Sequence, residues 1–197
     1  MIKGIIFDLD GTLVQLPINY DVIFEKLKNL FNTDDEFKPL IPTIITKADG
    51  SEYLIKQAFD IICNEETSST KNFKTIKNSI EILNYFRNKN FFLGLITMQC
   101  KDAATLVLDS MNCTDYFSSI ITRDDSHDRE TQIKKTIASS SLHPNEILVV
   151  GDRIHDVHSA KQVGCMGILS NKNKLNSFKD GTVISDLLEL KELIPKN

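Results

Sequence analysis

Short runs of apolar residues alternate along this chain with stretches whose apolar residues recur at helical spacing. Near-continuous apolar runs separated by helix-length segments are typical of βαβ units, in which helices cover both faces of a parallel sheet. The pattern predicts strands at Ile2–Phe7, Phe91–Thr97, Ser119–Thr122, Ile147–Val150, Met166–Leu169 and Thr182–Ile184. It predicts helices at Phe73–Asn88, Asp102–Met111, Glu130–Ser139, Ile154–Val163 and Asp186–Leu193. The predicted fold class is α/β, with a Rossmann-like doubly wound parallel sheet.

The interval 15–72 interrupts this alternation directly after the first strand. It has helical patterns at Tyr20–Phe31 and Ser51–Asn64 and no convincing strand, which favours a helical insertion over a long structureless loop. We therefore predict a core domain of residues 1–14 and 73–197 and a small helical domain of residues 15–72. The insertion either thickens the core or forms a mobile cap over whatever lies at the end of the first strand. Its aromatic residues are expected to form most of its own small core: Tyr20, Phe24, Phe31, Tyr53 and Phe59.

Composition and net charge limit the kinds of molecule that this chain is expected to bind. The chain has 197 residues, 25% of them charged, and a net charge of −4, which is ordinary for a soluble globular protein. Mild acidity argues against nucleic acid or an anionic membrane as the main partner, because both attract a basic surface. The apolar run at the N-terminus is broken by two acids, so we expect neither a signal peptide nor a membrane-spanning helix, and we expect a cytoplasmic location.

Two acids follow the first predicted strand, at Asp8 and Asp10, with Gly11 and Thr12 after them. Carboxylates this close repel each other and are costly to bury unless a cation lies between them. In open parallel sheets, ligands bind beyond the carboxyl ends of the strands, which is where these acids should lie. An ordinary Asx-type turn is the alternative explanation of the Asp-Gly pair.

Two further strands end in groups of the same kind. Ile147–Val150 is followed by Gly151 and Asp152, with Asp156 four residues later, and Phe91–Ile96 is followed by Thr97. Carboxylate oxygens are the usual protein ligands of Mg²⁺, and a Thr hydroxyl with the amides that follow it can hold a phosphate oxygen. Three strands ending in such groups at one face point to a cation and phosphate site.

These motifs resemble those of the haloacid dehalogenase superfamily, specifically its phosphatases with a cap inserted after the first motif. Asp8-Leu9-Asp10-Gly11-Thr12 resembles the first motif, DxDGT, and Thr97 stands where the second motif has its Ser or Thr. The segment from Gly151-Asp152 to Asp156 resembles the fourth motif, GDxxxD. The motifs occur in the right order over nearly the whole chain, and the size and position of the helical insertion are those of phosphoglycolate-phosphatase-like enzymes.

The resemblance implies a mechanism and roles for single residues. Asp8 would be the nucleophile that forms an aspartyl-phosphate, and Asp10 the general acid and then the general base. Mg²⁺ would be held by Asp8, the main-chain carbonyl of Asp10 and Asp152, with Asp156 in support. The positions implied in phosphate binding are Gly11, Thr97, Met98 and Arg129. A carboxyl at Asp10 also disfavours the dehalogenase branch of the superfamily, which lacks an acid there.

Two positions depart from the family's pattern. Met98 stands where the second motif often has Asn, so only its backbone amide could bind phosphate. The third motif needs a cation, usually a Lys, and the expected segment has none. Arg129 is the best substitute because it stays charged and can bind phosphate with a two-pronged contact, whereas Lys134 lies one turn further into the helix. Alternatively, Arg129 is a surface residue paired with a neighbouring acid.

The sequence leaves several functions open. The leading hypothesis is a Mg²⁺-dependent phosphomonoester hydrolase that acts on a small soluble phosphate. The alternatives are a phosphotransferase of the β-phosphoglucomutase type, which shares the motifs, and a pseudo-enzyme that binds phosphorylated ligands, suggested by the missing Lys. A receiver-like signalling domain is disfavoured, because such domains are shorter and have no acid two residues beyond the acceptor. The substrate and the oligomeric state cannot be predicted.

Overall fold

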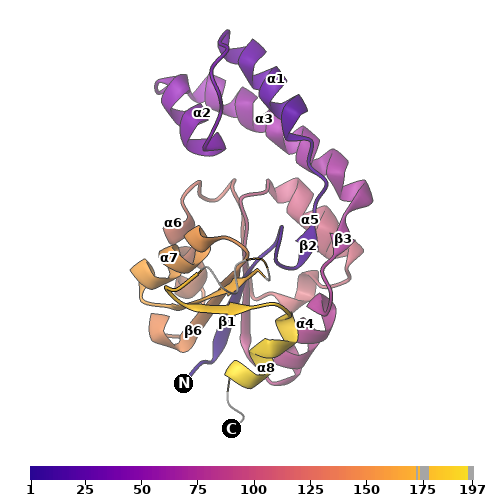
Figure 1. Cartoon of the computed structure of the whole chain (residues 1–197), viewed down its shortest axis with the longest axis vertical. Helices are drawn as coiled ribbons and strands as arrows, with labels where there is room; N and C mark the ends of the chain where they lie inside the picture. The colour runs from indigo at the N-terminus through magenta and orange to yellow at the C-terminus, as the bar shows by residue number, and fades with distance from the viewer. Residues whose placement is uncertain (172, 174–177, 195–197) are drawn as a thin grey trace. The chain divides into compact units, whose positions relative to one another are not determined.

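The computed structural model describes residues 1–171, 173 and 178–194 and divides the chain into two compact units (Figure 1). The core unit comprises Met1–Gln15 and Lys74–Asn197, and the helical unit comprises Leu16–Phe73. Each boundary therefore lies one residue after the corresponding boundary that we predicted from the sequence.

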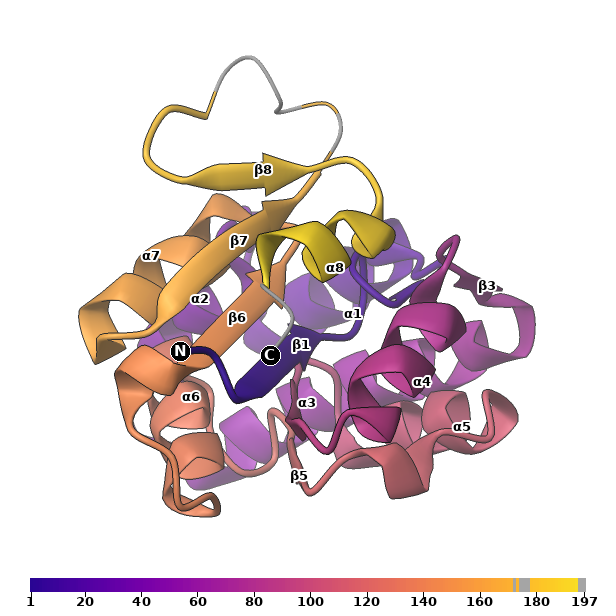
Figure 2. The same cartoon turned by 90° about the horizontal axis from the view of Figure 1, so that it is seen from below.

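The described part of the core unit is built on a six-stranded sheet whose neighbouring strands are all parallel. Its strands are β1 (Gly4–Asp8), β4 (Phe92–Ile96), β5 (Ser119–Ile121), β6 (Ile147–Gly151), β7 (Met166–Ser170) and β8 (Thr182–Ile184). Their order is β5-β4-β1-β6-β7-β8, so the chain reverses direction across the sheet at β1 (Figure 2). In open parallel sheets, ligands bind at such a reversal, outside the carboxyl ends of the strands. The predicted doubly wound α/β fold is confirmed.

Helices cover both faces of the sheet. Figure 2 shows α6 and α7 on one face, with α4, α5 and α8 on the other. The helices of this unit are α4 (Ser79–Asn88), α5 (Lys101–Ser110), α6 (Arg129–Ala138), α7 (Ile154–Val163) and α8 (Leu190–Leu193). Short 3₁₀ turns lie at Thr114–Tyr116, Pro144–Glu146 and Leu187–Glu189. Helix α6 packs on β4 and β5, and α7 packs on β6 and β7, so each places its first turn near the carboxyl edge of the sheet.

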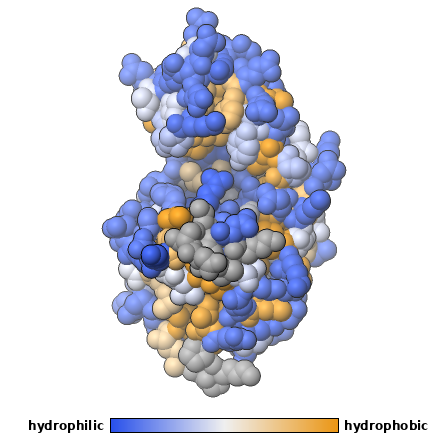
Figure 3. All heavy atoms as spheres, in the orientation of Figure 1, coloured by the Kyte–Doolittle hydropathy of each residue, from blue (hydrophilic) through white to orange (hydrophobic). Residues whose placement is uncertain are grey.

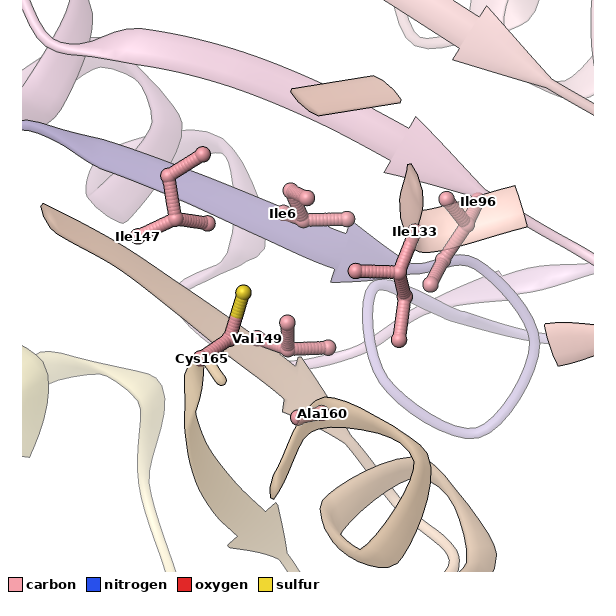
Figure 4. Packing of buried hydrophobic residues seen from close by; sticks show 7 residues of the cluster. All are labelled: Ile6, Ile96, Ile133, Ile147, Val149, Ala160 and Cys165. Atoms are coloured by element: carbon pink, nitrogen blue, oxygen red, sulfur yellow. The ribbon is translucent and has the colours of Figure 1, made fainter. Parts of the chain in front are cut away.

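A cluster of buried aliphatic side chains fixes α6 and α7 against the sheet. Figure 4 shows side chains of β1, β4 and β6 facing those of the two helices. The cluster consists of Ile6, Ile96, Ile133, Ile147, Val149, Ala160 and Cys165. None of the seven is more than 6% exposed. Because burying one such large aliphatic side chain stabilises a fold by about 1.5–3 kcal/mol, this packing holds the first turns of both helices in place.

The helical unit contains three α-helices and a short 3₁₀ turn, Thr70–Asn72. Helices α1 (Tyr20–Phe31) and α2 (Leu40–Ala48) both pack on α3 (Glu52–Ser69). The sequence pattern missed α2 and ended the last helix five residues early, at residue 64 instead of 69.

The expected aromatic core of the helical unit is wrong. Tyr20 and Tyr53 are 40% and 67% exposed, and the buried positions are mostly aliphatic instead. They include Ile23, Leu27, Ile44, Ala58 and Ile62. Phe24, Phe31 and Phe59 are half-buried, and the fully buried ring of this unit is Phe37, which the sequence analysis did not name.

The two chain segments that link the units pair as short antiparallel strands, β2 (Val14–Gln15) and β3 (Lys74–Thr75). The hydroxyl of Ser79 reinforces the pairing by donating to the carbonyl of Leu13 at 2.7 Å. The predicted helix over residues 73–88 therefore begins only at Ser79, because its first residues belong to this strand pair.

The surface in Figure 3 is mostly hydrophilic on the face shown, in both units. Within the residues that the structure describes, no helix is both long enough and apolar enough to cross a bilayer.

Candidate active site

The predicted site residues gather at the carboxyl edge of the sheet. Asp8 ends the central strand β1, and its neighbour in the β4 register is Ile96, directly before Thr97. On the other side, Phe7 pairs with Val150, so Gly151 and Asp152 follow at the same level. The parallel register alone thus brings the ends of three strands together, as the sequence predicted.

The loop after β1 turns back sharply at Gly11. The backbone N–H of Gly11 donates to the carbonyl of Val14 at 2.7 Å, and the carbonyl of Leu9 accepts from the N–H of Leu13 at 2.9 Å. Gly11 has a φ of +87°, and a Cβ there would lie 2.4 Å from the Asp152 carboxyl carbon. Only glycine therefore suits this position, because the loop carrying Asp10 passes directly against Asp152.

Arg129 is buried and contacts Asp8. Its Nη2 donates to Asp8 Oδ1 at 2.8 Å, and its Nε lies 3.0 Å from Asp156 Oδ1 in an ion pair without hydrogen-bond alignment. The side chain is 7% exposed, so the surface alternative for Arg129 is wrong. Lys134 is 60% exposed and pairs with Glu130 at 3.5 Å, on the outer side of the same helix.

Asp156 connects the start of α7 to this ion pair. It is 2% exposed, and its Oδ2 accepts from the backbone N–H of Arg153 at 3.1 Å. A Cβ on Gly151 would lie 2.3 Å from the same oxygen, so glycine at the end of β6 leaves the space that this carboxylate fills. The spacing of the fourth motif thus has a packing reason as well as a chemical one.

Burial and mutual repulsion raise the pKa values of two carboxyls of the site, Asp8 and Asp152. Burial raises the pKa of Asp8 to about 8; the Arg129 charge opposes this shift, and the charges of Asp156 and Asp152 add to it. Burial also raises the pKa of Asp152 to about 6, helped by Asp156 and Asp10 and opposed by Arg153. Asp8, Asp152 and Asp156 thus lie close enough for their charges to repel one another, which is the situation that a bound cation relieves.

The donor atoms of this cluster suit a hard divalent cation. Asp152 Oδ1 is buried and has no hydrogen-bond partner among the residues that the structure describes. Carboxylate and backbone carbonyl oxygens, which Asp8, Asp10 and Asp152 offer here, are the ligands that Mg²⁺ prefers. The residues present therefore fit such an ion.

The second motif is tied to its surroundings through its backbone. Thr97 is 1% exposed, and its Oγ1 accepts from the N–H of Gln99 at 3.1 Å. The carbonyl of Met98 accepts from Nη1 of Arg123 at 2.7 Å. Arg123 is itself buried, and our sequence analysis missed it. Its position two residues after the end of β5 at Ile121 is the signal that could have identified it, because that strand ends at the same edge of the sheet.

Gln132 is the second residue that the sequence analysis missed. It lies one turn after Arg129 on α6, is completely buried, and contacts both Arg129 and the carbonyl of Thr97. A lone Gln in a polar helix carries little signal, because only the orientation of α6 shows that this position faces inward.

The chain is similar to characterised proteins over almost all of its length. It is 25% identical to pyrophosphatase PpaX of Oceanobacillus iheyensis over 96% of this chain and 95% of that protein. It is 26% identical to phosphoglycolate phosphatase of Aquifex aeolicus, covering 95% and 96% of the two chains. A haloacid dehalogenase-like family hydrolase from Streptococcus pneumoniae has the same fold, with a TM-score of 0.71 and 18% identity over 98% of each chain.

The family model described as haloacid dehalogenase-like hydrolase matches residues 5–169. This span includes both acid motifs, Arg129 and the whole helical unit. The resemblance that we noted from the motifs is confirmed: the chain belongs to the haloacid dehalogenase-like hydrolase family.

Proposed function

We propose that this protein is a Mg²⁺-dependent phosphatase that hydrolyses a small soluble phosphomonoester through an aspartyl-phosphate. The observation that carries the proposal is the buried contact between Arg129 and Asp8 at the end of the central strand. A carboxylate next to one cation, with further acids beside it, suits attack on a phosphoryl group. The relatives named pyrophosphatase and phosphoglycolate phosphatase support phosphoryl chemistry.

In this mechanism Asp8 attacks phosphorus. One of its carboxylate oxygens accepts from Arg129, so we assign the attack to the other oxygen. The phosphorus–oxygen bond to the leaving group breaks as the new bond forms, and Asp10 gives its proton to the departing oxygen. Asp10 then takes a proton from a water molecule as the water oxygen attacks phosphorus. The phosphorus–oxygen bond to Asp8 breaks, which releases phosphate and restores the Asp8 carboxylate.

Mg²⁺ held by Asp8, the Asp10 carbonyl and Asp152, with Asp156 in support, would supply the positive charge that allows a carboxylate to approach a phosphoryl dianion. The unpartnered Asp152 Oδ1 and the repulsion among the acids support this assignment.

We assign the phosphoryl oxygens to Arg129, the hydroxyl of Thr97 and the backbone amide of Met98. Arg129 can contact these oxygens while it stays hydrogen-bonded to Asp8, and we assign it the role of the Lys that is missing from the third motif. The predicted role of Gly11 in phosphate binding is not retained, because its N–H donates to the carbonyl of Val14 inside the loop. The helical unit is proposed as the cap. The missing third-motif Lys was the argument for a pseudo-enzyme that only binds phosphorylated ligands. That argument no longer applies, because the guanidinium of Arg129 contacts Asp8.

The test is phosphate release from p-nitrophenyl phosphate, phosphoglycolate and pyrophosphate, with Mg²⁺ or with EDTA. We expect release only with Mg²⁺ and a loss of at least about a thousandfold in Asp8→Asn, because the nucleophile is gone. Asp60→Asn, an exposed change on the helical unit, is the control and should keep full activity. Activity that persists in EDTA or in Asp8→Asn would refute the mechanism. The compound that is hydrolysed fastest identifies the substrate class.

A further inference from the structure

Gln132 is a polar residue in the interior of the core unit. It is completely buried on α6, directly before Ile133 of the aliphatic cluster in Figure 4. A buried amide is costly unless its polar atoms are hydrogen-bonded. Leu or Met would fill the same space without that requirement, so the contacts of this amide need an explanation.

The amide group joins three parts of the site. Its Nε2 donates to the carbonyl of Thr97 at 2.8 Å and to the carbonyl of Ser126 at 3.0 Å. Its Oε1 accepts from Nη1 of Arg129 at 3.1 Å. The end of β4, the loop before α6 and the guanidinium are thereby fixed to one another.

These contacts matter because the cation is an arginine. Arg129 Nη2 donates to Asp8, Nε lies beside Asp156, and Nη1 donates to Gln132. A guanidinium is a planar group with several donors, and its orientation is defined only when more than one of them is held. A lysine has one nitrogen and needs no such orientation.

We propose that Gln132 is a positioning residue for Arg129. By accepting from Nη1, it fixes the rotation of the guanidinium, so that Nη2 stays on Asp8 and does not swing toward Asp156. The same amide keeps Thr97, through its carbonyl, at a constant distance from the cation. The inference rests on the proposed function of Asp8 as the nucleophile.

A double-mutant cycle tests the proposal. Gln132→Met keeps the approximate size of the side chain and removes all three of its hydrogen bonds. Arg129→Lys keeps the positive charge and removes the planar guanidinium with its several donors. We expect Gln132→Met to lower kcat/KM about tenfold in the Arg129 protein and less than about threefold in the Arg129→Lys background. An equal loss in both backgrounds, or no loss in either, would overturn the proposal.

Thr136→Val is the matched control. Thr136 is equally buried on α6, but its hydroxyl donates to the carbonyl of Gln132 within the helix, at 3.0 Å. We expect its kcat/KM to stay within about twofold of the unsubstituted protein. A loss as large as that of Gln132→Met would mean that any disturbance of the helix lowers activity.

A measurement without turnover separates this inference from the proposed function. In ¹⁵N NMR spectra, the Nε–H signal of Arg129, assigned by its loss in Arg129→Lys, should be sharp and slow to exchange. Gln132→Met should broaden it or speed its exchange. If the unsubstituted protein releases no phosphate, the proposed function fails, and this signal still decides the role of Gln132. An unchanged signal in Gln132→Met would contradict the positioning role.

Discussion

Arg129 is held between two carboxylates in a buried setting. Asp8 and Asp156 are 5% and 2% exposed, so neither can exchange its contact with Arg129 for water. Removing one partner of a buried ion pair leaves charge uncompensated and costs about 3–5 kcal/mol. We therefore expect Arg129→Met to lower the free energy of unfolding by that amount at about pH 9, above the pKa of Asp8, measured by urea denaturation in EDTA, and to reduce phosphate release at least about a hundredfold.

The matched control is Lys134→Met on the same helix. Lys134 is exposed, and its pair with Glu130 is of the kind that contributes little to stability. We expect a change in unfolding free energy within about 0.5 kcal/mol and unchanged activity. A large loss of activity in Lys134→Met, with Arg129→Met nearly unaffected, would reverse the assignment of the third-motif cation.

At the scale of elements, the first turn of α6 carries the cation and depends on its cap. Asp128 accepts from the N–H of Thr131 at 2.8 Å and from its hydroxyl at 2.7 Å, and these hydrogen bonds hold the pKa of Asp128 below its usual value. Loss of an N-cap costs about 1 kcal/mol and frays the turn. We expect Asp128→Ala to lower thermal stability and to reduce kcat severalfold, because Arg129 is the first residue of the helix.

Ser51→Ala removes a comparable cap from α3 in the helical unit, where the Ser51 hydroxyl accepts from Leu54 N at 3.3 Å. It should cost similar stability and leave kcat within about twofold. An equal loss of activity in Asp128→Ala and Ser51→Ala would mean that the caps affect activity only through overall stability. The position of the first turn of α6 would then not explain the loss.

An element could be predicted when the pattern of its own residues decides its structure, and not when contacts with distant residues decide it. The strands at the site were predictable because Ile147–Val150 and Phe91–Ile96 are buried on both faces and read as continuous apolar runs. Helix α2 was missed because its β-branched residues and Pro42 suit a strand or a turn as well as a helix, and only packing on α3 decides between them. The same limit applies to Gln132, whose role depends on the distant carbonyl of Thr97.

For the whole molecule, the buried acids couple folding to protons and to metal. The pKa of Asp8 is about 8 in the folded protein, against 3.8 for an ordinary Asp. Between these values the folded protein holds a proton that the unfolded chain has lost, so stability falls as pH rises through the folded pKa. His127 has the opposite effect on the pH dependence of stability, because burial lowers its pKa below 6.5. Its contribution to this pH dependence ends above pH 6.5. The change in stability between pH 6.5 and 8.5 is therefore due mainly to Asp8.

We expect the melting temperature in EDTA to fall between pH 6.5 and 8.5, measured by circular dichroism. Mg²⁺ competes with the proton for the same oxygens, so its stabilisation should grow with pH. At a concentration one hundred times its dissociation constant it would add about 2.7 kcal/mol, or about 5–10 °C in a domain of this size. Asp8→Asn has no proton to lose there and should flatten the decline in EDTA. A melting temperature in EDTA that is constant over this range, or a Mg²⁺ shift that is the same at both pH values, would mean that Asp8 is already ionised without metal.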